Sequence, residues 1–492
     1  MINRNSIFSL LSVVLGSALV WLLLGCPVTG IDDADIFLVY ARHFAEGHGF
    51  VYNIGCEYVE GFTSMLWTLV GSGFFRIFQT LEIPLLVLNL FFGVAATGAC
   101  LRRTERPGIF LLMLAAAPAW FAWCQISLME TGLWCLIVTL LGLAVIERRE
   151  TALMLLLPFL LITRPESMLL GAWAIVLVVL REEKGSRFKS AVGPVLVFGL
   201  SLLLLIGFRL WYFGYPVPNT YYAKVSPSVF ANIRNGLGYL LGFTSSGAAI
   251  FLVIALWASQ LVRGGKERSA AFWLALFLLP GIGIPVLVGG DHFGGFRFYQ
   301  PLWPLLCLLA ADAWPKLADK VRPSIAKTVL AALVIAGWGQ FTLSANLKHE
   351  FRIAREGRAN GAVLVQMFQD VECWPTVATI TAGGNKLSYP GHVHDLMGLN
   401  SIEMAHAPGY WDGYKNHTGF NRDIFYRWMP NILLCGDSEE FDSMVLGGLH
   451  DDPRFNLFYT KCTLHRNGVK LNAWYSNEFL LELPGIGRPP HP

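Results

Sequence analysis

The chain contains little charge for its length. Only 14% of its 492 residues are Asp, Glu, Lys or Arg, whereas 54% are hydrophobic, and the mean hydropathy is +0.51. Soluble domains carry about 25% charged residues, so this composition excludes a soluble globular protein and indicates a polytopic membrane protein. The net charge of +3 is too small to indicate a nucleic-acid partner, and membrane lipids are the expected surroundings.

Metal-ligand spacing and internal repeats are also absent. The nine cysteines form no C-x-x-C pair and no Cys/His pattern of the kind that binds zinc. We therefore expect no structural metal and chemistry that does not depend on a metal. The chain shows no tandem repeat and no inverted pair of interrupted hydrophobic segments, features that are common in transporters.

Two adjacent carboxylates, Asp32 and Asp33, follow the first hydrophobic run directly. That run, Ile7–Leu24, is long enough to cross the membrane, and Arg4 before it predicts a cytoplasmic N-terminus. A cleaved signal peptide ending near Leu22–Cys26 is the alternative, although many more spans follow. Placing two carboxylates where a helix leaves the bilayer costs free energy unless water, a cation or a substrate contacts them. The pair therefore predicts the floor of an active site.

Hydrophobic runs separated by short basic loops predict about eleven spans, with ten to thirteen allowed. The segment Ile36–Ala45 has apolar residues at helical spacing and predicts an amphipathic helix at the membrane interface. Two apolar runs, Thr63–Phe78 and Pro84–Cys100, precede the basic cluster Arg102–Arg106. If both runs crossed, this cluster would lie outside, so either one run does not cross or the cluster breaks the positive-inside rule.

The composition changes from residue 345 onward. Charges, His, Asn and Gly become more frequent, and no run is long enough to cross the membrane. A segment of this size can bury its own core, and the run Val377–Ala382 predicts a strand that Gly383 and Gly384 interrupt. We therefore expect a transmembrane domain at residues 1–344, with its first extracytoplasmic loop at 26–62. A soluble α/β domain outside the cytoplasm is expected at 345–492.

The polar residues of the expected spans share one feature, which is that they fall at the outer ends. Any one of them alone could be an interface anchor or a snorkelling side chain. Together they predict one site if the spans surround a single cavity. These residues are Asp32, Asp33, Glu60, Glu130, Arg164, Glu166, Asn219, Tyr222, Lys224, Asp291 and Arg297.

Such a set suits the transfer of a sugar from a lipid phosphate to an alcohol. A carboxylate can take the proton of the acceptor, and cations can meet the departing phosphate. Asp33 or Asp32 fits the first role, although Asp33 could instead cap a helix that begins at Ala34. The expected phosphate-binding cations are Arg164, Lys224 and Arg297, and the expected substrate contacts are Glu60, Glu130, Glu166, Asn219, Tyr222 and Asp291.

Several motifs carry a resemblance to a known family. The first extends from Asp32 through Tyr40-Ala41-Arg42, Glu46-Gly47-His48-Gly49 and Tyr52-Asn53 to Val59–Thr63. The later ones are Leu128–Thr131, Thr163–Glu166, Pro218–Lys224, Gly289–Asp291 with Arg297-Phe298, and Asp395–Leu399. Over nearly its whole length the chain resembles the multi-spanning glycosyltransferases of GT-C architecture. Within them it is most similar to the branch of the mycobacterial terminal arabinofuranosyltransferases.

The resemblance implies a polyprenyl-phosphate sugar as donor and co-substrate, with no further cofactor. It also implies an active site facing away from the cytoplasm and an aspartate base, carried over to Asp33 with Asp32 beside it. Cys56 departs from the pattern, which usually has a small or polar residue there, and residues 292–295 also differ from it. These departures concern the recognition of the acceptor rather than the chemistry.

The composition favours a Gram-negative host, because the chain lacks the high Ala and Arg content of actinobacterial proteins. Proteins of similar length and layout act there as O-antigen glucosyltransferases, which use undecaprenyl-phosphate glucose. The leading hypothesis is an inner-membrane glycosyltransferase that modifies a cell-surface glycan, most simply the O-antigen of lipopolysaccharide, in the periplasm. The alternatives are an arabinofuranosyltransferase that uses polyprenyl-phosphate arabinose, a flippase for a lipid-linked sugar, and a structural subunit of a glycan-assembly complex.

Overall fold

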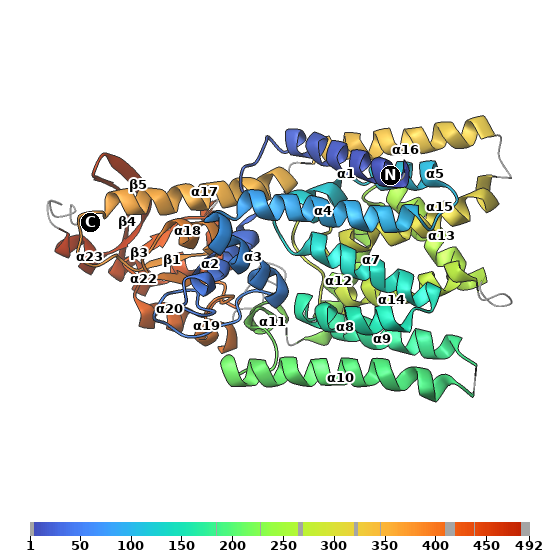
Figure 1. Cartoon of the computed structure of the whole chain (residues 1–492). Coiled ribbons are helices and arrows are strands. Elements are labelled where there is room, and N and C mark those ends of the chain that lie inside the picture. The colour runs from blue at the N-terminus through green and yellow to red at the C-terminus, as the bar shows by residue number, and fades with distance from the viewer. Residues whose placement is uncertain are drawn as a thin grey trace.

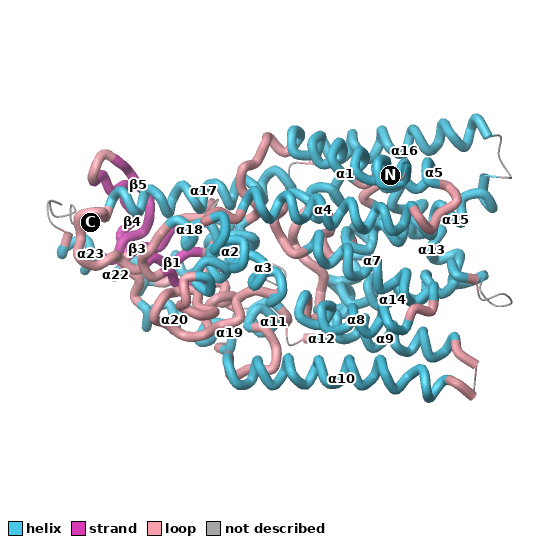
Figure 2. Tube along the Cα trace, in the orientation of Figure 1, coloured by secondary structure: helices cyan, strands magenta, loops and turns pink. Residues whose placement is uncertain are grey.

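The structure is a computed structural model that describes residues 4–183, 185–226, 228–263, 269–318, 323–344, 346–408, 419–436 and 438–483. Figure 1 shows a bundle of long helices joined at one end to a region of strands and shorter helices. All strands lie in that second region, as Figure 2 shows. Residues 264–268 and 319–322, which belong to two of the short basic loops, lie outside the described residues.

The bundle contains the long apolar helices of the first 343 residues. Their bounds are α1 (Arg4–Leu23), α4 (Glu82–Leu101), α5 (Pro107–Ala115), α6 (Pro118–Phe121) with a π-helical turn (Ala122–Ile126), α7 (Thr131–Glu147), α8 (Glu150–Thr163), α9 (Ser167–Arg181), α10 (Arg187–Tyr212), α12 (Val229–Ser245), α13 (Ala248–Arg263), α14 (Ala270–Leu287), a 3-10 turn (Gln300–Leu302), α15 (Trp303–Ala318) and α16 (Pro323–Leu343). Three further helices lie outside the long bundle: α2 (Asp32–Ala45), α3 (Met65–Phe78) and α11 (Asn219–Lys224).

Among the described residues, five helices are long and apolar enough to cross a membrane: α1, α4, α10, α14 and α16. The number rises to seven if each of two bent pairs is one span. One pair joins α5 to α6 with an 80° bend, and the other joins α12 to α13 with a 112° bend. Four shorter apolar helices, α3, α7, α8 and α9, accompany them. The chain is therefore a mostly helical membrane protein, and the count of about eleven spans stays a prediction.

The contacts at the two ends of α4 show at which end of the bundle the basic cluster Arg102–Arg106 lies. The amide of Asn5 donates to the backbone oxygen of Leu101 at 3.1 Å, so the end of α4 lies beside the start of α1. At its other end, Glu82 forms an ion pair with Arg358 in the C-terminal part. The helix α4 therefore runs from the junction of the two regions to the end of the bundle where α1 begins, while α3 packs beside α2 at the junction (Figure 1). The cluster Arg102–Arg106 consequently lies at the same end as the N-terminus.

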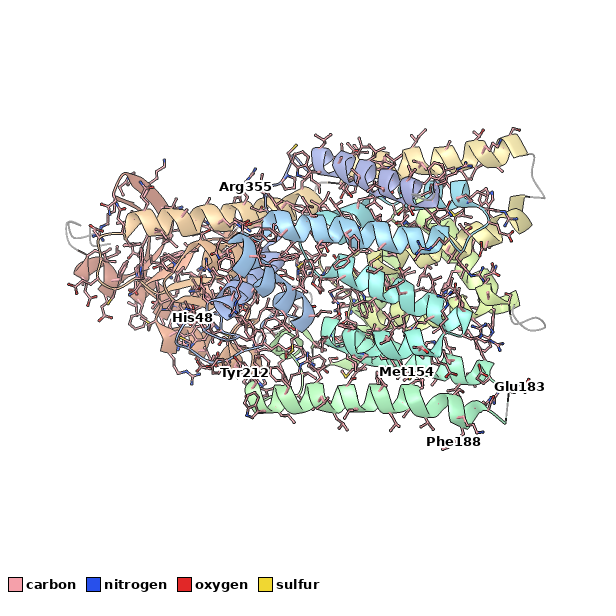
Figure 3. All side chains as sticks on the ribbon, viewed as in Figure 1. His48, Met154, Glu183, Phe188, Tyr212 and Arg355 are labelled. Carbon is pink, nitrogen blue, oxygen red and sulfur yellow. The ribbon has the colours of Figure 1, made fainter. Side chains whose placement is uncertain are left out.

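Other expected inner loops gather at this same end of the bundle. Arg103 lies 3.9 Å from Glu147, and Thr104 donates a hydrogen bond to Asp312 at 3.3 Å. Figure 3 places Glu183 and Phe188 at the end farthest from the sheet, whereas Tyr212 lies at the opposite end of α10. The polar residues expected on the outer side therefore share the end that meets the sheet region.

The C-terminal part begins with α17 (Asn346–Met367) and contains a five-stranded sheet in the order β2-β1-β3-β5-β4. The first three strands are parallel and the last two pairings are antiparallel. The strands are β1 (Val377–Thr379), β2 (Val393–Asp395), β3 (Ile432–Leu434), β4 (Tyr459–Arg466) and β5 (Val469–Ser476). Its short helices are α18 (Ala382–Ser388), α19 (Ile402–His406), α20 (Arg422–Trp428), α21 (Glu439–Val445), α22 (Pro453–Phe458) and α23 (Asn477–Glu482), with a 3-10 turn (Leu449–Asp451).

Local chemistry explains several of these elements. The predicted strand after residue 376 is present and ends at Thr379, and Gly383 and Gly384 fall inside the helix α18. The hairpin β4–β5 turns at Asn467 and Gly468, whose φ angles are 50° and 77°. A two-residue loop with both residues in the left-handed region matches the right-handed twist of the strands it joins.

The helix α2 is buried on nearly all sides, which differs from the expected helix at the membrane interface. It packs between α3 and α18, because the C-terminal part covers the face that was expected to meet water. A Cβ atom at Gly383 would lie 1.9 Å from the backbone oxygen of Asp32, so only glycine allows this approach. Arg358 of α17 adds two hydrogen bonds to Asp35, at 2.8 and 2.5 Å. The C-terminal part thereby fixes the helix that carries the acidic pair.

Candidate active site

A cavity of about 480 Å³ lies where the bundle meets the sheet region. Its deeper walls are apolar and come from α7, α9 and α14, with Trp134, Leu169 and Ile284 among the lining side chains. Its head is polar. The charged residues that line it are Asp33, Arg164, Glu166, Lys224, Asp291 and Arg297.

Asp33 lies in the first turn of α2, immediately after the first membrane helix. Its Oδ2 atom accepts a hydrogen bond from Arg297 Nη1 at 3.0 Å and lies 3.5 Å from Lys224 Nζ. Its Oδ1 atom has no donor within the part of the chain that the structure describes. The helix cap is Ile31, and Asp33 is already helical, so the interpretation of Asp33 as a helix cap is wrong.

The charges around Asp33 decide its protonation. Burial alone would raise the pKa of its carboxyl group, but Lys224 and Arg297 outweigh burial and hold this pKa well below its usual range. Asp33 is therefore an anion at neutral pH. Its proton affinity will rise whenever either cation turns to another partner.

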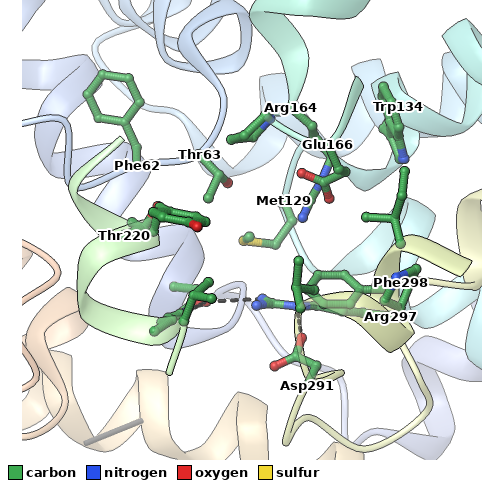
Figure 4. Close-up of a pocket in the computed structure, with 18 of the residues that line it drawn as sticks. Phe62, Thr63, Met129, Trp134, Arg164, Glu166, Thr220, Asp291, Arg297 and Phe298 are labelled. Carbon is green, nitrogen blue, oxygen red and sulfur yellow. Dashed lines mark hydrogen bonds and ion pairs between the residues drawn. The ribbon is translucent and has the colours of Figure 1, made fainter. Parts of the chain in front are cut away.

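Arg297 is held by a second carboxylate and by aromatic rings. Its guanidinium forms an ion pair with Asp291, which follows two glycines that both have positive φ. The guanidinium also lies 4.2 Å from the ring centre of Phe293 and 5.5 Å from that of Phe298. Figure 4 shows the interaction that joins Arg297 to Asp291 among the residues that line the cavity. Arg297 holds the pKa of Asp291 well below its usual range despite burial.

Arg164 occupies the opposite wall of the cavity head, at the turn after α8. Its Nε atom donates to Glu166 at 2.6 Å, and its Nη1 atom donates to Glu130. Thr63 also donates to the same oxygen of Glu130, at 3.2 Å. Arg164 lies 5.3 Å from the ring centre of Phe298, so both arginines contact this ring. Glu130 is fully buried behind Arg164 and orients it.

Lys224 reaches the cavity from the short helix α11, whose position depends on Asn219. The side-chain amide of Asn219 donates to three backbone oxygens of the C-terminal part. These belong to Gly398, Leu399 and Ser401, at 2.8, 3.0 and 3.2 Å. Asn219 is thus occupied by protein contacts, and these contacts anchor the helix that presents Lys224.

Three more of the expected residues point away from the cavity. Asp32 accepts hydrogen bonds from the backbone N–H groups of Gly383 and Gly384, at 3.0 and 2.8 Å. Glu60 accepts two hydrogen bonds from Arg209, both at 2.8 Å, and both side chains are buried. Tyr222 packs on His406, with 4.1 Å between ring centres. None of the three is among the cavity-lining residues of the described chain.

The structure also adds residues that sequence reasoning missed. Glu350 of α17 is mostly buried, and burial together with the charges of Asp33 and Asp291 raises its pKa to about 8. Arg209 is the buried partner of Glu60, and it was not among the residues expected at the site. The sequence contains no signal for Glu350, because it follows a membrane helix in a segment rich in charged residues.

No group of three or more His, Cys, Asp or Glu side chains that could hold a metal ion occurs in the described ranges. The expectation of metal-independent chemistry stays a prediction. The cations Arg164, Lys224 and Arg297 are the positive groups that the cavity head contains.

Comparisons with known proteins concern the fold. No protein-family model matches the chain, and a comparison with curated protein sequences finds no match. Among solved structures, the chain is similar to the crystal structure of ArnT from Cupriavidus metallidurans bound to undecaprenyl phosphate, with a TM-score of 0.56. The superposition covers 97% of this chain and 99% of that one at 13% sequence identity. At this identity the similarity shows a shared fold, in agreement with the predicted helical membrane architecture.

Proposed function

We propose that the protein is a membrane glycosyltransferase that transfers a sugar from a polyprenyl-phosphate donor to a glycan acceptor. The observation that carries this proposal is the position of Asp33 between Lys224 and Arg297 at the head of an apolar cavity. A carboxylate and cations at this point suit an acceptor hydroxyl and a donor phosphate, respectively. The shared fold with a protein crystallised with undecaprenyl phosphate supports the choice of donor.

The cavity has the two-part character that such a donor requires. The apolar walls from α7, α9 and α14 suit a prenyl chain, because hydrocarbon gains free energy when it leaves water. The polar head with Arg164, Lys224 and Arg297 suits the phosphate. Lys224 is the most exposed of these three cations, and its 3.5 Å contact with Asp33 is long for a charged hydrogen bond. Lys224 can therefore exchange its contact with Asp33 for a contact with the donor phosphate more easily than Arg297 can.

Donor binding would thereby activate the base. In the ligand-free protein Lys224 and Arg297 depress the pKa of Asp33, which makes this carboxylate a weak base. When the donor phosphate engages Lys224 and shares Arg297, Asp33 loses part of this stabilisation and its pKa rises. Asp33 therefore becomes a stronger base once the donor is bound.

The chemical step follows from these positions. The acceptor oxygen forms a bond to the anomeric carbon of the donor sugar, and its proton passes to the Asp33 carboxylate. The bond between that carbon and the phosphate oxygen breaks, and polyprenyl phosphate leaves with the electron pair. Arg297 and Lys224 meet the charge that develops on the leaving oxygen, and Glu130 and Glu166 hold Arg164 beside it.

The positions of the basic residues support an outward-facing site. Arg4, Arg103 and Arg149 lie at the end of the bundle opposite the cavity head, which is the arrangement of a cytoplasmic end. We therefore place the protein in the inner membrane, with residues 1–344 as its catalytic membrane domain. Residues 345–492 form the periplasmic α/β domain that covers the site. The acceptor we favour is a surface glycan such as the O-antigen of lipopolysaccharide, because the composition indicates a Gram-negative host.

The test is an assay that separates transfer from transport. Purified protein in proteoliposomes is supplied with a panel of radiolabelled polyprenyl-phosphate sugars and with lipopolysaccharide acceptor. We expect label from one donor to become covalently attached to the acceptor. Movement of the intact labelled donor across the bilayer without attachment would favour a flippase, and no change in either measurement would favour a structural subunit.

A further inference from the structure

A second cavity, of about 330 Å³, lies between the first outer loop and the C-terminal part. The loop residues Tyr52–Val59 form one wall, and β2 with its neighbours forms the other. Asn53 joins the two walls, because its amide donates to the backbone oxygen of Val393 at 3.0 Å and accepts from the backbone N–H of Val393 at 3.0 Å. The Asn53 side chain thus pairs with the backbone N–H and C=O groups of Val393 in an edge strand, and it holds the two walls of the cavity together.

The second cavity adjoins the first. Gly61 and Leu399 line the main cavity, whereas Val59 and Asn400, each one or two residues away, line the second. The same two segments therefore separate the two cavities. A chain-like ligand with one unit beside Asp33 could therefore place a further unit in the second cavity.

The lining of the second cavity is polar and carries one aromatic platform. Trp428 stacks on His394, with 4.6 Å between ring centres and 21° between ring planes. The indole N–H of Trp428 donates to Glu403 at 2.8 Å, and Glu403 also pairs with Arg427. Glu57 accepts from the backbone N–H of Ile402 at 3.0 Å through one oxygen. The other oxygen of Glu57 accepts no hydrogen bond within the described ranges.

The two histidines of the cavity add neutral donors and acceptors. Burial lowers the pKa of His394 to about 3 and also lowers that of His392, so both rings are neutral at physiological pH. A neutral imidazole offers one donor and one acceptor, which complements a hydroxyl group. The ring nitrogens of His394 have no hydrogen-bond partner among the described residues. An uncharged ligand with many hydroxyl groups therefore fits better than an anion or a hydrocarbon chain.

We propose that the second cavity binds a neutral sugar unit of the acceptor glycan, at a distance from the hydroxyl that reacts. Trp428 presents its ring to the apolar face of the sugar, and Glu57 and His394 bind its hydroxyl groups. This inference rests on the proposed function for the identity of the ligand as an acceptor. The binding itself requires no donor and no turnover.

The experiment measures saccharide binding by the full-length protein in lipid nanodiscs. The probe is an array of defined bacterial surface oligosaccharides, and the strongest neutral ligand is then titrated by calorimetry. We expect Trp428→Ala and Glu57→Ala each to weaken binding by at least about tenfold. The matched controls Trp374→Ala and Glu372→Ala, outside both cavities, should bind as the original chain does. The melting temperature of each variant checks its folding, and Glu57→Ala decides if Trp428→Ala does not fold.

The outcomes separate this inference from the proposed function. Absence of binding to any neutral saccharide overturns the inference, as does binding that survives both cavity variants. The inference is also overturned if the second cavity binds a zinc ion and no saccharide, and if the zinc binding is lost in His394→Ala. Saccharide binding that depends on Trp428 and Glu57, without sugar transfer from any donor, contradicts the proposed function alone.

Discussion

The carboxylates of Asp32 and Asp33 are adjacent in sequence but serve different contacts. Asp33 accepts a hydrogen bond from Arg297 at 3.0 Å in the cavity, whereas Asp32 accepts from the backbone N–H groups of Gly383 and Gly384. Successive residues of a helix are about 100° apart around its axis, so the two side chains leave the helix in different directions. Asp33 is therefore placed for the proposed chemistry, whereas Asp32 attaches the C-terminal part to α2.

Asp32→Asn should weaken this attachment more than it affects the chemistry. Asparagine keeps one oxygen for one of the two N–H groups and leaves the other N–H without its acceptor. We expect a lower melting temperature and a sugar-transfer rate, per folded molecule, within about tenfold of that of the original chain. A transfer rate as low as that of Asp33→Asn would show that Asp32 takes part in the reaction.

The protonation of Asp32 should make stability depend on pH. Burial raises the pKa of Asp32 from 3.8 to about 7 in the folded protein. Because the folded state binds the proton more tightly than the unfolded state, this group favours folding below pH 3.8. That contribution is lost as the pH rises to about 7. The melting temperature of the original chain should therefore fall more between these pH values than that of Asp32→Asn. Parallel curves for the two proteins would contradict the assignment.

Part of this site could be predicted from the sequence. Asp33, Arg164, Lys224, Asp291 and Arg297 were expected together because each ends a span on the outer side, and the structure brings all five to one cavity. The reasoning succeeds for these residues because the membrane restricts the ends of the spans to two planes.

The remainder depends on contacts between segments that are distant in sequence. Glu60, Asn219 and Tyr222 also reach the outer side, but their side chains contact protein groups that no local pattern reveals. The partner of Glu60 is Arg209, and the partners of Asn219 are three backbone oxygens near residue 400. Which face of a short helix meets the cavity depends on how the C-terminal part docks, and that docking leaves no periodic signal in the sequence.

Glu60→Gln should destabilise the protein without a specific effect on the reaction. The substitution leaves the buried guanidinium of Arg209 without its charged partner, and such losses cost about 3–5 kcal/mol. We expect a large fall in melting temperature, which the double variant Glu60→Leu with Arg209→Met should partly reverse. A stable Glu60→Gln protein with impaired donor or acceptor binding would instead indicate a role in substrate recognition.

Lys224→Ala should shift the pH dependence of catalysis. After burial, the charge of Lys224 is the largest influence on the pKa of Asp33, and it lowers that pKa. Without Lys224 the carboxylate takes up a proton at higher pH, so the acidic limb of kcat/KM should move to higher pH. The control is Lys348→Ala, an exposed residue of α17, which should leave the profile unchanged. An unshifted acidic limb in Lys224→Ala would show that the limb does not report Asp33.

The most direct test of the central claim is the single-turnover rate of sugar transfer in Asp33→Asn. The variant is prepared in proteoliposomes with saturating donor and acceptor, beside Asp423→Asn as an exposed control. Asparagine nearly preserves the shape of the side chain but cannot accept the proton, so the rate should fall by about 10²–10⁴-fold. Donor binding and the melting temperature should remain close to those of the original chain, and Asp423→Asn should transfer at the original rate. A transfer rate for Asp33→Asn within a few-fold of the original would contradict the account.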